Sequence, residues 1–512
     1  MLVASLTACG GGGGGGSTPP GASNPGNPAG PGSGSTATPA PGTSASATPA
    51  PAATTPPPGS TPTPSPTNTQ AGNGPTILPN TTGALGLVQL ADNYGGNNGP
   101  LSSSQIASEA PYYNTVWAAF QPATWTSDHG SGTPMILSLY STPFEDMNLV
   151  SGNTLAYFQQ NHPSWLLYGC AKDGTPTTDL AWSGTGFSDV PLNIDNPDVR
   201  NFEVTELVNY MASNGYNALA VDQVVFENFL LSPNPILENG KQPVSGSYGC
   251  GTYATYPPNN NFTRVFGSAS GGELYNTNDQ TFNNDIIQWL AAAKTALNAH
   301  GFSLLVNHPP SGSAPNTLEQ QMLQYADGEV VENGFTDYGA YISSGLPGLF
   351  TQTLSYAQTL QSQYKKAVFL TYYYGGSSNA SASSLSGAQV DWALATYALA
   401  NLGGADAYIV PEGVDEYSYR GEYANDNYGA ACGSMTQNGS VYMQQFQHGL
   451  AIVNAGYSNQ SVTLPAGISY TDIENRAAII SPMQVGPADG WMLLTSGNGC
   501  GSSSSSVIRR RP

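Results

Sequence analysis

Positive charge is scarce in this sequence. Only 9% of the residues are charged, and 12 Lys and Arg side chains stand against 33 Asp and Glu, which gives a net charge of -21. Nucleic acids and anionic lipid surfaces are bound through clusters of cations, and this chain has few cations to cluster. We therefore expect no nucleic-acid partner and no large Arg-based phosphate site.

The motifs of common metal-dependent and cofactor-dependent enzymes are also missing. The five His residues show no metal-ligand spacing such as H-E-x-x-H, and there is no P-loop and no Gly-x-Ser-x-Gly turn. No continuous apolar run reaches the roughly 18 residues that predict a membrane-spanning helix. We expect neither a metal site nor a cofactor.

Large apolar residues are nearly absent from residues 10–80, which are dominated by Gly, Pro, Ser, Thr and Ala. Such a segment cannot bury enough apolar surface to offset the entropy of ordering it, so we expect a disordered tether. Directly before it, Leu6-Thr7-Ala8-Cys9 resembles the lipobox of bacterial lipoproteins, in which Cys9 would be lipidated. Residues 1–9 contain no Lys or Arg, so we expect Met1 to lie inside a longer signal. A membrane anchor would place the chain in the bacterial cell envelope, at the outer membrane or cell surface.

Four further cysteines are an even number, and in an oxidising compartment they could form one or two disulfides. They are Cys170, Cys250, Cys432 and Cys500. Their spacing leaves the pairing open.

Residues 81–440 alternate short apolar runs with helical patterns. The candidate strands are Gly86–Ala91, Thr115–Phe120, Pro134–Tyr140, Ala218–Val224, Ser303–Asn307, Gly328–Glu332, Ala367–Tyr372 and Asp406–Val410. Runs such as Leu219–Val221 are apolar on both faces, as strands covered by helices require. Eight strand–helix units predict an α/β fold, the (β/α)8 TIM barrel. A doubly wound open sheet is the alternative, but its Gly-rich phosphate turn is absent.

The pattern changes near residue 441. Short β-like runs separated by turn residues predict a small antiparallel β-domain over residues 441–497. Residues 498–512, which are rich in Ser and end in basic residues, are expected to form a flexible tail.

Acidic residues follow several of the predicted strands, where TIM barrels carry their active sites. Asp222 ends the fourth strand and Glu332 the sixth, so both should lie at the barrel mouth. Glycosidic cleavage needs two carboxyl groups flanking the bond. We predict that Asp222 is the nucleophile or base and Glu332 the acid/base, with Glu412 as a competing second carboxylate.

Other polar side chains at strand ends could bind a sugar by hydrogen bonding or stacking. They are Asp92, Tyr140, Asn307, His308, Tyr372 and Glu412. Core packing is the competing explanation for the tyrosines, and a solvent-facing loop position is the competing explanation for His308.

Three segments resemble a recurrent pattern of glycoside hydrolases. Leu192–Arg200 resembles an "N-P-x-V-R" helix start, Asn214–Asp222 a "G-[YF]-[DN]-G-[VIL]-x-x-D" strand, and His162–Tyr168 an "HP-x-WF-L" segment. The chain is most similar to the hypothetical glycosyl hydrolase family 15, and more distantly to endo-α-1,4-polygalactosaminidases. Gly449–Asn454 also resembles the β-domain that follows the barrel in these proteins.

This resemblance implies a TIM barrel in which Asp222 is catalytic. The chain departs from the pattern at Gly169-Cys170, at Asn217 and Ala218, and in a long insertion over Leu231–Asp279. These departures leave the substrate open.

We therefore expect an extracytoplasmic glycoside hydrolase that acts on a polysaccharide or oligosaccharide as a monomer. A non-catalytic carbohydrate-binding protein or a structural envelope lipoprotein on the same scaffold is the alternative. The sugar, the linkage and the stereochemical outcome stay open.

Overall fold

The computed structural model describes a series of segments between Gly86 and Cys500. They are residues 86–91, 101–129, 135–143, 145–146, 150, 152–166, 168–170, 176–180, 190–224, 226, 254–256, 261–263, 280–331, 334–337, 340–341, 348–372, 386–402, 407–410, 428–473 and 477–500. The predicted signal and tether lie outside them, and so does the predicted tail beyond Cys500. Within these segments no helix combines the length and apolar character that crossing a bilayer requires.

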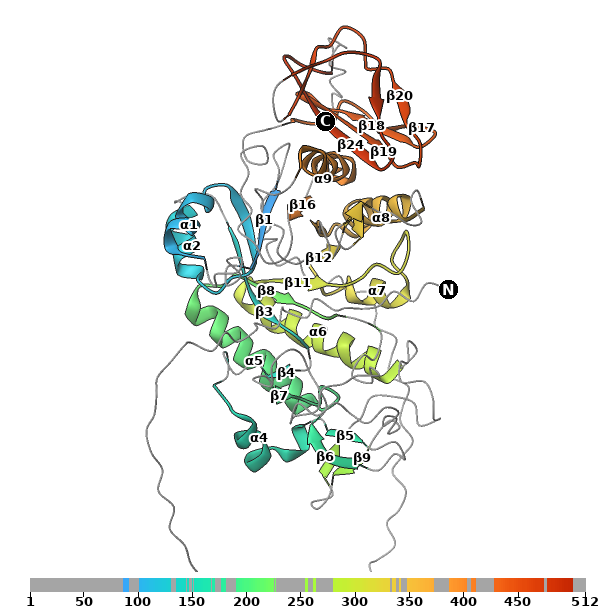
Figure 1. Ribbon diagram of the computed structural model, residues 1–512. Helices are drawn as coiled ribbons and strands as arrows, with labels where there is room; N and C mark the ends of the chain where they lie inside the picture. Colours follow the sequence, from blue (N-terminus) through green and yellow to red (C-terminus); the bar gives the residue numbers. More distant parts are fainter. Residues whose placement is uncertain are drawn as a thin grey trace, which may run out of the picture. The chain divides into compact units, whose positions relative to one another are not determined.

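Eight parallel strands form the central sheet (Figure 1). They are β1 (Gly86–Ala91), β2 (Tyr113–Ala118), β3 (Ile136–Ser141), β8 (Ala218–Val221), β11 (Ser303–Asn307), β12 (Gly328–Val331), β15 (Ala367–Thr371) and β16 (Ala407–Val410). Each strand pairs with the next in this order, and β1 pairs with both β2 and β16, which closes the ring. The prediction of parallel strands is confirmed, and each of the eight predicted runs overlaps one of them.

Strand side chains alternate between the inside of this ring and the surrounding helices. The inner side chains form their own apolar cluster, to which Trp117, Ala220, Leu305 and Phe369 belong. Small residues make room for the large ones: a Cβ added at Gly328 would lie 2.8 Å from the Phe369 ring. The outer side chains belong to a second, larger cluster shared with the helices.

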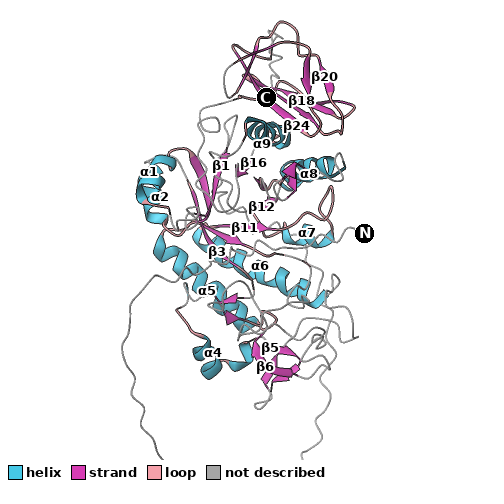
Figure 2. Cartoon of the chain, in the orientation of Figure 1, coloured by secondary structure: helices cyan, strands magenta, loops and turns pink. Residues whose placement is uncertain are grey.

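Helices occupy the connections between the strands, as Figures 1 and 2 show. They are α1 (Ser103–Glu109), α2 (Pro122–His129), α4 (Leu155–Asn161), α5 (Pro197–Asn214), α6 (Gln280–His300), α7 (Thr317–Met322), α8 (Gly348–Thr359) and α9 (Gly387–Ala400). Helix α5 starts as its sequence predicts, because Asn196 caps the Asp198 N–H at 2.9 Å and Pro197 occupies the first helical position. It ends at Gly215, whose φ of 84° is left-handed.

The C-terminal segment forms an antiparallel sheet, which confirms the predicted antiparallel strands after the parallel ring. Its six strands are β17 (Thr436–Asn438), β18 (Val441–Gln445), β19 (Gly449–Asn454), β24 (Asp489–Thr495), β21 (Tyr470–Asp472) and β22 (Ala478–Ile479), with β20 (Gln460–Val462) and β23 (Met483–Val485) paired separately. A disulfide joins Cys432 to Cys500, which settles the pairing of two cysteines. Helix α9 packs against this sheet, where the Met492 N–H donates to Asp391 at 3.2 Å.

The remaining short strands pair in twos. They are β4 (Glu145–Asp146) with β7 (Val190–Pro191), β5 (Tyr168–Cys170) with β6 (Pro176–Leu180), β9 (Ala254–Tyr256) with β10 (Asn261–Thr263), and β13 (Thr336–Asp337) with β14 (Ala340–Tyr341).

Candidate active site

Asp222 lies directly after β8, at the carboxyl end of the fourth barrel strand, and is 4% exposed. Its carboxylate accepts three hydrogen bonds. The Tyr140 hydroxyl donates to Oδ2 at 2.7 Å, while Asn307 Nδ2 and the Gln223 N–H donate to Oδ1 at 2.9 and 2.8 Å. The structure therefore brings together three of the predicted site residues.

Strand register explains this meeting. β8 lies between β3 and β11, and Tyr140 is the Cα partner of Ala220 in the neighbouring strand. Ala220 belongs to the inner cluster, so Asp222, two residues further along, points to the same side of the strand. Tyr140 and Asn307 reach it from the strands on either side.

Burial and hydrogen bonding act on Asp222 in opposite directions. Burial raises the pKa of its carboxyl group, and the bonds from Tyr140, Gln223 and Asn307 lower it; burial dominates. No described Lys, Arg or His forms an ion pair with Asp222. All three partners donate, so the carboxylate is held as an acceptor. This is the state that a nucleophile or general base requires.

The backbone after Asp222 makes a tight left-handed turn. Gln223 has a φ of 55°, a conformation that L-residues other than Gly adopt only at a cost of about 1–2 kcal/mol. Neighbouring strands hold it: the Asp222 N–H donates to Ser141 O at 2.8 Å, and the Val224 N–H donates to Asn307 O at 3.2 Å. Such strain is concentrated at functional sites.

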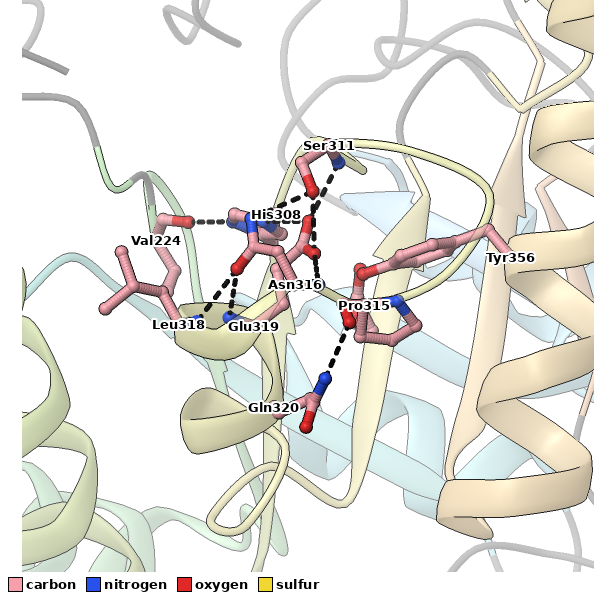
Figure 3. Close-up of polar contacts among 10 residues, drawn as sticks. Val224, His308, Ser311, Pro315, Asn316, Leu318, Glu319, Gln320 and Tyr356 are labelled. Atoms are coloured by element: carbon pink, nitrogen blue, oxygen red, sulfur yellow. Dashed lines mark hydrogen bonds and ion pairs between the residues drawn. The ribbon is translucent and has the colours of Figure 1, made fainter. Parts of the chain in front are cut away.

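His308, the residue after β11, does not occupy the solvent-facing loop position that was the competing explanation for it. It is 4% exposed and both ring nitrogens are occupied, Nδ1 by Val224 O at 2.6 Å and Nε2 by Glu319 Oε1 at 3.0 Å (Figure 3). His308 therefore supports the turn beside Asp222 instead of facing solvent. Sequence reasoning missed Glu319, although Asn316 and Glu319 have the spacing of a capping box.

Tyr372 does not join this group. It is fully buried, and its hydroxyl is 2.6 Å from Thr396 Oγ1 of α9. It belongs to the outer cluster with Val368 and Leu370, so it packs between the strand and the helix.

The remaining predicted residues lie outside the described segments. They are Cys9, Asp92, Glu332 and Glu412. The pairing of Asp222 with Glu332 therefore stays a prediction.

A buried carboxyl group that the sequence did not reveal lies in the middle of β12. Glu329 is fully buried and accepts from the Tyr356 hydroxyl of α8 at 2.9 Å. Burial raises its pKa to about 8, so this carboxyl is protonated at neutral pH. Among the described residues, no cluster of His, Cys, Asp and Glu has the makings of a metal site.

Comparison with known proteins gives structural likenesses only. No protein-family model and no curated protein sequence matches the chain. It is similar to trehalulose synthase MutB from Pseudomonas mesoacidophila, with 10% identity and a TM-score of 0.44 over 81% of this chain and 99% of that one. The maltogenic alpha-amylase AmyB from Thermotoga neapolitana matches over the same shares, with 9% identity and a TM-score of 0.43. Aspergillus fumigatus Ega3, in complex with galactosamine, has 12% identity and a TM-score of 0.28 over 57% of this chain and 78% of that one. A proposal for function therefore depends on the geometry around Asp222.

Proposed function

We propose that this chain is a glycoside hydrolase that cleaves O-glycosidic bonds of a polysaccharide outside the cytoplasm. One observation carries the proposal. The buried carboxylate of Asp222 directly follows β8 of the parallel ring, and hydrogen-bond donors from both neighbouring strands orient it. The carboxyl ends of the strands are where barrel enzymes carry their chemistry. A carboxylate fixed there without a described counter-ion is suited to attack on, or activation of water at, an anomeric carbon.

In the proposed mechanism, Asp222 acts ionised, as nucleophile or base, and Tyr140 and Asn307 fix the direction of its lone pairs. The second carboxyl group is proposed to be Glu332. In the sequence it directly follows Val331, the last residue of β12. A separation of about 5–5.5 Å between the two carboxyl groups would mean retention, and roughly 6.5–9.5 Å inversion.

The direct test replaces Asp222 by Asn. We expect hydrolysis, measured as reducing ends released from a panel of polysaccharides, to fall by at least about 10²- to 10⁴-fold. Oligosaccharide affinity, measured by calorimetry, should change little, because Asn has nearly the same shape.

The matched control is Asp327→Asn. Asp327 precedes β12 at the opposite end of the strand, where Lys294 Nζ bonds it at 2.6 Å. This variant should lose stability but keep turnover. Full activity in Asp222→Asn would overturn the proposal, and binding without turnover in the unaltered protein would indicate a non-catalytic carbohydrate-binding protein.

We also propose that the chain is anchored in the bacterial cell envelope by lipid on Cys9. The lipobox-like Leu6–Cys9 sequence, which directly precedes the Gly- and Pro-rich segment, supports this location.

A further inference from the structure

The two hydrogen-bond partners of the His308 ring can only accept. Val224 offers a carbonyl oxygen to Nδ1, and a carbonyl has no proton to give. Glu319 offers Oε1 to Nε2. A neutral imidazole has one N–H and one bare nitrogen, so it would leave one of these contacts without a proton.

Glu319 has no proton to give either, because other donors surround its carboxylate. The Ser311 N–H donates to Oε1 at 2.8 Å, and the Ser311 hydroxyl donates to Oε2 at 2.8 Å. That hydroxyl itself accepts from Asn316 Nδ2 at 2.9 Å, which directs its proton towards Glu319. The Asn316 N–H also donates to Oε2. A carboxylate with this many donors is ionised, and both ring nitrogens of His308 must therefore donate.

Charges on the surrounding elements agree with this geometry. Glu319 faces His308 from α7 and Glu329 from β12, while Tyr356 of α8 reaches the cluster through Glu329. Burial lowers the pKa of His308, but the hydrogen bond to Glu319, the Val224 carbonyl and the charge of Glu319 act in the opposite direction, and the pKa lies above its ordinary value. The contact with His308 and the bonds from Asn316 and Ser311 outweigh burial and lower the pKa of Glu319.

The ring and its neighbour together hold the turn that carries Asp222. Asn307 accepts from the Val224 N–H through its backbone and donates to Asp222 through its side chain. His308 donates to the Val224 carbonyl. Three hydrogen bonds from one dipeptide thus span Asp222 to Val224, and His308 is the member that links this turn to α7.

We propose that His308 is a constitutively charged positioning residue, an imidazolium that ties the Val224 carbonyl to Glu319 and thereby holds Asp222 in its reactive orientation. Its charge state follows from geometry alone; its effect on turnover rests on the hydrolase proposed above.

The charge is tested by nitrogen NMR of protein labelled with ¹⁵N only in histidine. At about pH 7.5, above the ordinary histidine pKa of roughly 6.5, one of the five histidines should still have both nitrogens protonated. The signal of this doubly protonated ring should be absent from the spectrum of His308→Gln. In Glu319→Gln the His308 ring should give the signal of a neutral imidazole. If that variant fails to fold, the pH titration of the unaltered protein still decides the point. Five neutral histidines at this pH would overturn the proposal.

The positioning role is tested by the pH dependence of kcat/KM. In Glu319→Gln we expect the alkaline loss of activity to move to lower pH, because a neutral His308 ring can no longer donate to both the Val224 carbonyl and residue 319. We also expect kcat to fall by a larger factor than KM changes. The control is Glu203→Gln, a buried carboxyl on α5 that accepts from Trp289 Nε1 at 3.1 Å. It should lower stability without moving the profile.

The two proposals fail in different ways. Absence of turnover in the unaltered protein would sink the hydrolase and leave the NMR result standing. If Glu319→Gln keeps its turnover and the alkaline side of its kcat/KM profile stays at the same pH, the positioning role alone is refuted.

Discussion

At the scale of single residues, the environment of Asp222 is set by three donors and by burial. Its pKa lies above the ordinary value because burial outweighs the three hydrogen bonds. An enzyme that uses the ionised carboxylate therefore loses activity as the pH falls through this raised pKa. The acid limb of the activity profile should report on Asp222.

Tyr140→Phe tests this link. Removing the hydroxyl takes away a bond that lowers the Asp222 pKa, so the acid limb should move to higher pH. A hydrogen bond to a charged group contributes about 1.5–3 kcal/mol, so kcat/KM should drop by roughly one to two orders of magnitude. Tyr372→Phe loses a fully buried hydroxyl, the one bonded to Thr396, and should leave the limb in place. Identical profiles for the two variants would contradict the role of Tyr140.

At the scale of elements, the disulfide closes the segment that forms the C-terminal sheet. It links Cys432, before β17, to Cys500, after β24, across a sequence separation of 68 residues. A cross-link over a loop of this length restricts the unfolded chain and contributes roughly 4 kcal/mol.

We expect Cys500→Ser to lower the thermal midpoint measured by calorimetry under oxidising conditions, since the unfolded chain regains that freedom. Cys432→Ser should have the same effect, and the double variant should add little beyond either one. A midpoint insensitive to all three changes would mean that the bond does not restrict unfolding.

The sequence was sufficient to locate the strands, because a strand buried on both faces appears as an uninterrupted apolar run. Asp222 could be found because it ends such a run. The side of the strand that a residue faces was harder to predict. Tyr372 follows β15 by one position and faces the helices. Thr371, one position earlier, lies two residues after Phe369 of the inner cluster, so it faces the inside of the ring.

The contact between His308 and Glu319 could not be predicted for a related reason. It spans a loop whose side-chain directions no periodic pattern specifies. Glu329 belongs to a strand of mostly apolar residues, and the sequence does not show that the Tyr356 hydroxyl of α8 lies beside it.

At the scale of the whole molecule, the proposed lipid on Cys9 is directly testable. Cells that express the protein from its own gene and are fed an alkyne-labelled fatty acid should yield labelled protein, and Cys9→Ala should abolish the label and release the protein from the membrane fraction. Unlabelled protein in the membrane fraction would refute the anchor. Cys250→Ala serves as the control, because Ser247 stands three positions before Cys250, where the lipobox-like sequence has Leu6.

Helix α9 is buried at every position from Val390 to Ala400, between strands of the ring and the C-terminal sheet. At Gly490 of β24, an added Cβ would lie only 2.9 Å from the Trp392 Cα, which shows how closely strand and helix approach. Over this stretch α9 has no solvent-exposed face, so it cannot be assigned to the ring or to the C-terminal sheet alone when genes recombine. An evolutionary exchange of the C-terminal sheet would have to rewrite α9 at the same time, so the two parts are expected to be inherited together rather than shuffled as separate modules.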